Sequence, residues 1–222
     1  MEITTEMIKE LRNATGAGVL DCRKALTENN GDIEAAIDWL RKKGQKVAAL
    51  RGDRDAREGV VLAKTTADNK TGIALCVSCE TDFVSKNADF VSFAQSIMDA
   101  AIKANVKSVD ELNQVEVNGA KIADMVNDKL ASIGEKIGIS KFERIEADFV
   151  SSYIHGTNRM GVLVGLNQAK AEAGKDVAMQ IAAMNPVAVD QASVPAETIE
   201  REKAIVTDLI KNDPKMAESR KK

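Results

Sequence analysis

The sequence predicts an α+β protein, in which three short helices precede a core of two related units of antiparallel sheet and helix. Three observations support this fold class. Apolar residues recur at helical spacing over residues 1–44, and strand-like apolar runs begin near residue 59. A strand pair followed by a helix then occurs twice, and Gly72 and Gly161 are separated by almost the same distance in sequence as Phe90 and Val177.

The composition is that of a globular protein. Of the 222 residues, 44% are hydrophobic and 29% are charged, while only 3% are aromatic. Aliphatic side chains must therefore fill most of the core. The formal net charge of -3 gives no electrostatic reason to expect direct nucleic-acid binding. The sequence has no signal peptide, organelle presequence or long apolar run. We therefore expect no membrane contact and a cytoplasmic location.

Residues 1–44 are predicted to form a three-helix docking unit. Thr4 and Asp32 are placed to cap the first and third helices. Gly16 lies in a turn-forming segment after the first helix, and Gly44 is expected to end the third. Because so small a unit is only marginally stable alone, we expect it to serve as a docking module on a longer chain.

Residues 45–58 are predicted to form a basic linker. Arg51, Arg54 and Arg57 alternate there with two aspartates. The favoured interpretation is a solvated linker or helix whose charges pair with one another. The alternative is that the arginines face an acidic partner.

The rest of the chain is divided into residues 59–145 and 146–190, the two core subdomains, and residues 191–222, a charged helical segment that could be one arm of a helical hairpin. The first predicted elements are strands at 60–63 and 73–77, followed by a helix whose apolar side holds Phe90, Phe93, Ala94, Ile97, Met98 and Ala101. A helix at about 119–132 and a strand at 137–142 come next. Strands at 151–155 and 161–166 and a helix at 177–184 complete the prediction. The polar end at 215–222 lacks a closing core element, which is typical of a fragment.

Catalytic and metal-binding groups are scarce. His155 is the only histidine, so no metal site based on several histidines can be built. We favour a structural or contact role for His155 over catalysis. Gly16 and Gly18 lack the third glycine and the preceding strand of a dinucleotide loop, and no Walker-type lysine follows. We expect no enzyme, no catalytic residue, no metal and no cofactor.

Cys76 and Cys79 formally match the spacing of a redox pair. Cys76 ends an apolar strand, and the alternation of a strand puts the two sulfurs on opposite faces. A zinc site would need a second cysteine pair, but only Cys22 remains. We therefore predict buried, inert cysteines.

Two aromatic residues leave alternatives open. Phe83 lies between a strand and the helix that holds Phe90, and the pattern alone favours a place in the core. The alternative is an exposed ring on a supported loop, available for insertion into a partner. Trp39 lies beside the apolar stripe of the third helix, and is either a rim residue or a partner contact.

Three groups of motifs resemble the signatures of the bacterial elongation factor Ts family, in the order in which that family has them. They are LRNATGAGVLDCRKAL at residues 11–26 with GDIEAA at 31–36, CETDFV at 79–84, and YIHG at 153–156 with RMGVLV at 159–164. The resemblance covers residues 1 to about 190.

The resemblance implies a ubiquitin-associated-like domain at residues 1–44, two related core subdomains, and elongation factor Tu, a GTPase, as the partner. It implies that Thr81, Asp82, Phe83 and Val84 disturb the Mg²⁺ site of the partner, with Asp82 and Phe83 most important and Phe83 as the inserting side chain. It also implies that Arg12, Val19, Leu20 and Arg23 meet the nucleotide domain of the GTPase, and that His155 contacts the partner.

The chain departs from the family pattern in three places. Val19 and Leu20 stand where many relatives have a pair of methionines, and apolar contact should survive this change. Lys136 stands where asparagine is usual. The segment after residue 195 resembles the start of a helical dimerisation region, which allows a homodimer, and we expect the carboxy-terminal module of longer members to be missing. We expect its loss to weaken binding to the GTPase.

The resemblance therefore implies a guanine-nucleotide exchange factor for elongation factor Tu. The absence of a phosphate-binding loop agrees with an action on nucleotide held by another protein. One alternative is a passive module that binds a partner without exchange. A thiol oxidoreductase is a third and weaker hypothesis.

Overall fold

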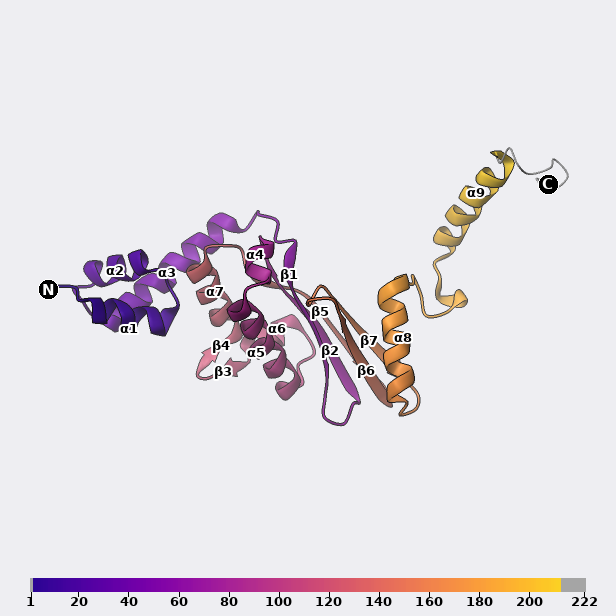
Figure 1. The fold of residues 1–222 in the computed structure, drawn as a ribbon, viewed down its shortest axis with the longest axis horizontal. Coiled ribbons are helices and arrows are strands. Elements are labelled where there is room, and N and C mark those ends of the chain that lie inside the picture. The colour runs from indigo at the N-terminus through magenta and orange to yellow at the C-terminus, as the bar shows by residue number, and fades with distance from the viewer. Residues whose placement is uncertain (1, 213–222) are drawn as a thin grey trace. The chain divides into compact units, whose positions relative to one another are not determined.

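The computed structural model describes residues 2–212, apart from the side chains of residues 48 and 49. The chain divides into two compact units, Met1–Ala182 and Ala183–Lys222. The first unit contains helices together with antiparallel strands, so the predicted mixed class is confirmed. Figure 1 shows the order of the elements.

Three helices open the chain, namely α1 (Thr5–Thr15), α2 (Val19–Glu28) and α3 (Ile33–Arg51). The buried apolar residues of these helices and of the α1–α2 connection form a cluster of their own, made of Leu11, Ala17, Cys22, Ala25, Leu26, Ala36 and Leu40. The predicted caps are confirmed. The hydroxyl of Thr4 accepts the N–H of Met7 at 3.3 Å, and the carboxylate of Asp32 accepts the N–H of Ala35 at 3.0 Å.

The predicted end of the third helix is wrong. α3 continues through Gly44 to Arg51, so the first half of the predicted 45–58 linker is helical. Gly44 instead allows a close helix crossing, because a Cβ at this position would lie 2.5 Å from the Cβ of Ala131 on α7 (Ile122–Ile133). Packing against α7 therefore outweighs the low helix propensity of glycine.

The first sheet has the strand order β1-β2-β5, and both pairings are antiparallel. Its strands are β1 (Glu58–Thr65), β2 (Thr71–Cys79) and β5 (Gly138–Glu146). One face packs against α5 (Ala88–Ala104), in which all six predicted apolar positions are buried. The predicted strand pair and its helix are thus confirmed.

A second hairpin covers the other face of this sheet. It consists of β6 (Phe149–His155) and β7 (Met160–Leu166). The approach is close, because a Cβ at Gly72 would lie 2.7 Å from Val150 and one at Gly161 would lie 3.1 Å from Val61. α8 (Ala171–Met184) flanks the hairpin, and Figure 1 shows α5 and α8 on the two outer sides of the stacked strands.

Several short elements were not predicted. They are α4 (Asp82–Ser85), α6 (Val109–Gln114), β3 (Glu116–Val117) and β4 (Ala120–Lys121). Elements of one or two turns carry no measurable hydrophobic period, which explains the omission. The predicted end of α7 near Gly134 is confirmed, and Gly134 caps the helix in the left-handed conformation, at φ 78°.

The second unit contains a 3₁₀ turn (Gln191–Ser193) and α9 (Ala196–Asn212). Ile205, Val206 and Leu209 of α9 are exposed. The rest of the predicted 191–222 segment, including the polar end at 215–222, lies outside the described residues. Among residues 2–212, no helix has both the length and the apolar character that a bilayer span requires.

Candidate functional site

Phe83 lies on the surface, at the end of β2. It belongs to α4, a single helical turn, and its side chain is 84% exposed. The next residue, Val84, is partly buried against the main core, and Ser85 is buried. The interpretation of Phe83 as a core residue is therefore wrong, because the turn directs Val84 inward and Phe83 outward. A large apolar ring held in water is available for contact with a partner.

Local hydrogen bonds close the α4 turn. The hydroxyl of Ser85 donates to the carbonyl of Asp82 at 3.1 Å, and the carboxylate of Asp82 pairs with Lys86 at 2.6 Å. This hydrogen bond from Lys86 and the positive charge of Lys86 lower the pKa of Asp82. The side chain of Asn87 then caps α5 by accepting two backbone N–H groups. The turn is thus fixed on its carboxy-terminal side.

Glu135 holds the other side of the turn. Its carboxylate accepts the N–H groups of Glu80 and Thr81, both at 3.1 Å, and the hydroxyl of Thr81 at 2.7 Å. Thr81 occupies the N-cap position of α4, but its side chain makes no capping bond there. The hydroxyl is used instead to attach the turn to a distant segment.

Glu80 makes the reverse connection. Its carboxylate accepts the N–H of Lys136 at 2.6 Å, and pairs with Arg51 at 2.7 Å and with Arg54 at 3.1 Å. The N–H of Lys136 and the two guanidinium groups lower the pKa of Glu80 to about 2, although burial opposes this change. Only 14% of the Glu80 side chain is exposed, so the carboxylate relies on these partners.

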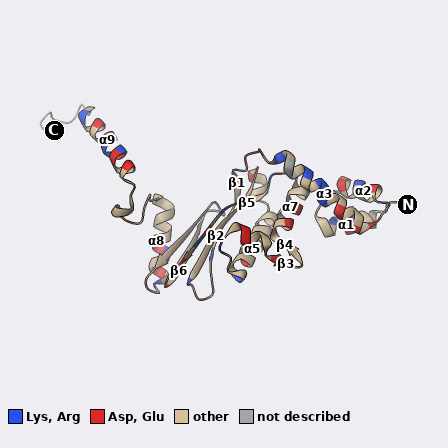
Figure 2. Cartoon of the chain, turned by 180° about the vertical axis from the view of Figure 1, so that it is seen from behind, with Lys and Arg blue, Asp and Glu red and all other residues tan. Residues whose placement is uncertain are grey.

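The predicted self-pairing of the linker charges is confirmed only for Arg57, which pairs with Asp55 at 2.6 Å. Arg51 and Arg54 pair with Glu80, so neither the self-paired nor the partner-facing interpretation describes them. Both arginines thus contact the residue two positions before α4. Figure 2 marks in blue the positions of Lys and Arg along α3 and the loop that follows it.

A hollow beside the α4 turn is bordered by the turn between β6 and β7. Asn158 fastens that turn to β1, because its carbonyl accepts the N–H of Val61 at 2.8 Å and its side-chain amide donates to the carbonyl of Val61 at 3.3 Å. Arg159 pairs with Glu58. The full lining is Glu58, Glu80, Thr81, Asp82, Phe83, Ser85, Lys86, Val91, Thr157, Asn158 and Arg159. Sequence reasoning did not single out Glu58 or Asn158, and no local signal marks them.

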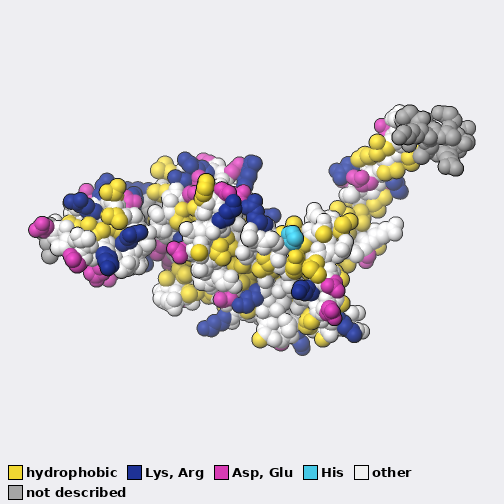
Figure 3. Space-filling model, in the orientation of Figure 1, with side chains coloured by type: hydrophobic (Ala, Val, Ile, Leu, Met, Phe, Trp, Pro, Cys, Tyr) yellow, Lys and Arg dark blue, Asp and Glu magenta, His cyan; other side chains and the backbone are white. Residues whose placement is uncertain are grey.

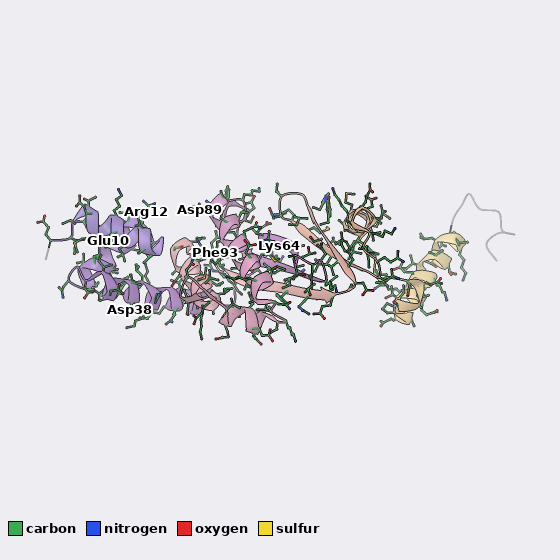
Figure 4. The ribbon with its side chains drawn as sticks, turned by 90° about the horizontal axis from the view of Figure 1, so that it is seen from below. Glu10, Arg12, Asp38, Lys64, Asp89 and Phe93 are labelled. Atoms are coloured by element: carbon green, nitrogen blue, oxygen red, sulfur yellow. The ribbon has the colours of Figure 1, made fainter. Side chains whose placement is uncertain are left out.

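The four predicted contact residues of the three-helix unit are all exposed, on α1 and α2. Leu20 is 82% exposed and Val19 is 49% exposed. α2 buries Cys22, Ala25 and Leu26, which turns Leu20 and Arg23 toward solvent. Arg12 is exposed on α1, and Figure 4 shows it at the outer side of the helices. This surface and Phe83 lie on different elements of the first unit.

The family described as "Elongation factor TS" matches residues 80–222, a range that begins two residues before α4 and covers more than half of the chain. The chain belongs to the elongation factor Ts family.

Relatives in this family match almost the whole chain. Elongation factor Ts of Christiangramia forsetii is 44% identical over 217 residues, which cover 96% of this chain and 78% of the relative. The protein of Amoebophilus asiaticus is 45% identical over 212 residues, covering 94% and 76%. That of Methylococcus capsulatus is 44% identical over 208 residues, covering 92% and 71%.

His155, the predicted contact of this elongation factor Ts family member on the second hairpin, is exposed at the end of β6. Its Nδ1 lies 3.0 Å from the hydroxyl of Tyr153. Figure 3 shows it at the surface as the cyan side chain. Among residues 2–212, no three His, Cys, Asp or Glu side chains are arranged to hold a metal ion.

The cysteines of this elongation factor Ts family member differ in burial. Cys22 and Cys79 are buried as predicted, whereas Cys76 is half-buried on the opposite face of β2. Burial, assisted by the charge of Glu135, raises the pKa of Cys79 to about 12, and burial also raises the pKa of Cys22. Trp39 is partly buried against the three-helix cluster, which agrees with a rim residue.

Proposed function

We propose that this chain is a guanine-nucleotide exchange factor for elongation factor Tu. The observation that supports the proposal is the exposure of Phe83 on a short, well-supported turn, in a chain of the elongation factor Ts family. Such a ring gains free energy by burial in a partner, because 84% of it is in water in the free chain.

Insertion of an apolar ring can release GDP without any chemical step. Mg²⁺ needs near-octahedral oxygen ligands and depends on few protein groups together with water and phosphate. A shift of the elements that hold this shell therefore weakens GDP binding. The ring acts only if the open partner buries it better than the closed partner does. By linkage, GDP then weakens binding of this chain by the same factor.

The remaining site residues have two kinds of role in this proposal, positioning Phe83 and contacting the GTPase. Thr81, Asp82 and Val84 place Phe83, while Arg12, Val19, Leu20 and Arg23 meet the nucleotide domain of the GTPase. His155 adds a contact from the second hairpin. Leu20 adds the most apolar contact among these residues, since 82% of it is exposed in the free chain and can be buried against the partner.

We also propose the domain organisation that the resemblance implies. Residues 1–44 form a ubiquitin-associated-like docking domain, and residues 59–145 and 146–190 form two related core subdomains. Residues 45–58, whose first half continues α3, connect them. Residues 191–222 belong to a helical dimerisation region, and the exposed apolar residues of α9 support that role. The chain would act in the cytoplasm, where translation takes place, with neither cofactor nor nucleic acid bound directly.

A passive binding module remains the second candidate. The exposure of Leu20, on an element separate from α4, favours it, because this surface could hold a partner without help from Phe83. The two candidates differ in one observable. A passive module binds the GTPase and leaves the rate of GDP release unchanged.

Release of a fluorescent GDP analogue from elongation factor Tu tests the proposal. The unmodified chain should accelerate release, and Phe83→Ala should lose most of the acceleration while keeping the fold. Val189→Ala is the matched control, since Val189 is also an exposed apolar residue but lies in the second unit. Equal acceleration by Phe83→Ala and the unmodified chain would remove Phe83 from the mechanism.

A further inference from the structure

The structure points to a positioning role for Glu135 and Glu80. We propose that their carboxylates hold the backbone of the α4 turn rigid, so that Phe83 is presented in one fixed direction to the partner. This inference rests on the proposed exchange function. In it, Glu135 and Glu80 affect GDP release only through the position of Phe83. The group formed by Glu80, Glu135, Lys136, Arg51 and Arg54 is called the carboxylate brace below.

The two carboxylates bind each other's segment. Glu135 accepts the N–H groups of Glu80 and Thr81, and Glu80 accepts the N–H of Lys136. The two segments are more than fifty residues apart in sequence, but each fixes the backbone of the other. Bonds to a charged acceptor are stronger than neutral ones, so this reciprocal pair resists opening.

The end of α3 is held by the same residues. Arg51, the last residue of α3, pairs with Glu80 at 2.7 Å. The ammonium group of Lys136 donates to the carbonyls of Gly52 at 2.6 Å and Arg54 at 2.9 Å. The brace therefore ties the helix that extends from the three-helix unit to the base of the α4 turn.

The position of Phe83 depends on its backbone. With 84% of the side chain in solvent, little of its own chain packs around the ring. Val84 and Ser85 fix the inner side of the turn, and the carboxylate brace fixes its start. Loss of the brace leaves Phe83 chemically intact but allows the turn to move. A ring on a mobile turn can move aside instead of shifting the elements of the partner. Its burial then stabilises the open state of the partner less.

The experiment measures accelerated GDP release as a function of the concentration of the full chain, which gives a maximal rate and a half-saturating concentration. Glu135→Ala removes three hydrogen bonds. We expect the maximal rate to fall about tenfold, since small misplacements of an acting group cost large factors in rate. The half-saturating concentration should stay within about twofold, because the surface around Leu20 is unchanged.

Glu135→Gln is the conservative variant. Its amide oxygen can accept the two backbone N–H groups, and its amide nitrogen can donate to the hydroxyl of Thr81, which accepts as well as donates. We therefore expect most of the maximal rate to return. Arg51→Ala should lower the maximal rate, whereas Arg57→Ala should not, because Arg57 pairs with the exposed Asp55 instead. Thermal melting of each variant reports the folded fraction.

The outcomes separate a positioning role from a structural one. Partial unfolding would raise the half-saturating concentration and leave the maximal rate unchanged. That result, or a maximal rate that Glu135→Ala leaves unchanged, overturns the positioning role. Equal losses in Glu135→Gln and Glu135→Ala overturn it too. If the unmodified chain fails to accelerate release, the proposed function falls and the positioning role falls with it. Faster amide hydrogen exchange at residues 80 and 81 in Glu135→Ala supports the brace independently of the GTPase.

Discussion

The carboxylates of Glu80 and Glu135 are linked through each other's backbone: Glu135 accepts the N–H of Glu80, and Glu80 accepts the N–H of the residue after Glu135. This arrangement fixes the start of the α4 turn, two residues before an aromatic ring that is almost entirely in solvent. A flexible loop would let such a ring find apolar cover on its own chain. The brace keeps it available to a partner.

The low pKa of Glu80 makes the stability of the chain depend on pH. Its folded pKa of about 2 lies below the ordinary value of 4.5, so the charged form is favoured by folding. The stabilisation is complete above about pH 4.5 and is lost as the pH falls through about 2. Glu80→Gln should lower the free energy of unfolding by about 2 kcal/mol near neutral pH.

Urea unfolding of both proteins, near neutral pH and at about pH 2.5, measures this difference. We expect the advantage of the unmodified chain over Glu80→Gln to shrink at the acidic pH. An advantage of the same size at both pH values would show that the charge of Glu80 is not stabilised by its partners.

Leu20 should contribute affinity rather than rate. Leu20→Ala is expected to raise the half-saturating concentration for GDP release about tenfold and to leave the maximal rate unchanged. Leu50→Ala is the control, because Leu50 is 83% exposed on α3 and lies outside the contact motifs. A fall in maximal rate for Leu20→Ala, with the affinity retained, would contradict this division of roles.

Gly44 should not tolerate a side chain. A Cβ there meets Ala131 at 2.5 Å, so Gly44→Val should cost about 1–3 kcal/mol of unfolding free energy through overpacking of α3 against α7. Chemical denaturation measures the loss. Gly138→Ala provides the comparison, since nothing lies within 4 Å of a Cβ at Gly138. Equal stability of Gly44→Val and the unmodified chain would mean that the two helices do not pack closely.

The cysteines should react with alkylating reagents at different rates. Cys79 is buried with a pKa of about 12, so almost none of its thiolate exists at mildly alkaline pH, and Cys22 is buried too. Cys76 is half-buried and should be modified first in the native chain. Mass spectrometry of the alkylated peptides identifies the order, and early modification of Cys79 would contradict the burial of the site.

Local features of the fold were predictable from the sequence. Thr4 and Asp32 act within one turn of their own positions, so their capping roles follow from sequence alone. The apolar face of α5 was also predictable, because helical periodicity survives over its whole length. The prediction for Gly44 was wrong because the packing partner that keeps this glycine in a helix, Ala131, is far away in sequence.

The candidate site was predictable only in part. The resemblance identified Phe83, whereas the pattern of the neighbouring residues favoured its burial. Its exposure depends on a single turn that directs Val84 inward instead, and one turn has no period to detect. The brace was missed entirely, since a bond between Glu80 and Lys136 joins segments that no local pattern connects. Arg51 and Arg54 were assigned to a linker for the same reason.

The most direct test of the central claim measures the maximal rate of GDP release from elongation factor Tu. The fold-loss in this rate caused by Glu135→Ala is compared between the unmodified chain and the Phe83→Ala variant. If Glu135 acts by presenting Phe83, its removal costs about tenfold in the first background and almost nothing in the second, because coupled residues are not additive. Equal losses in both backgrounds would show that the brace and the ring act independently, and would contradict the account.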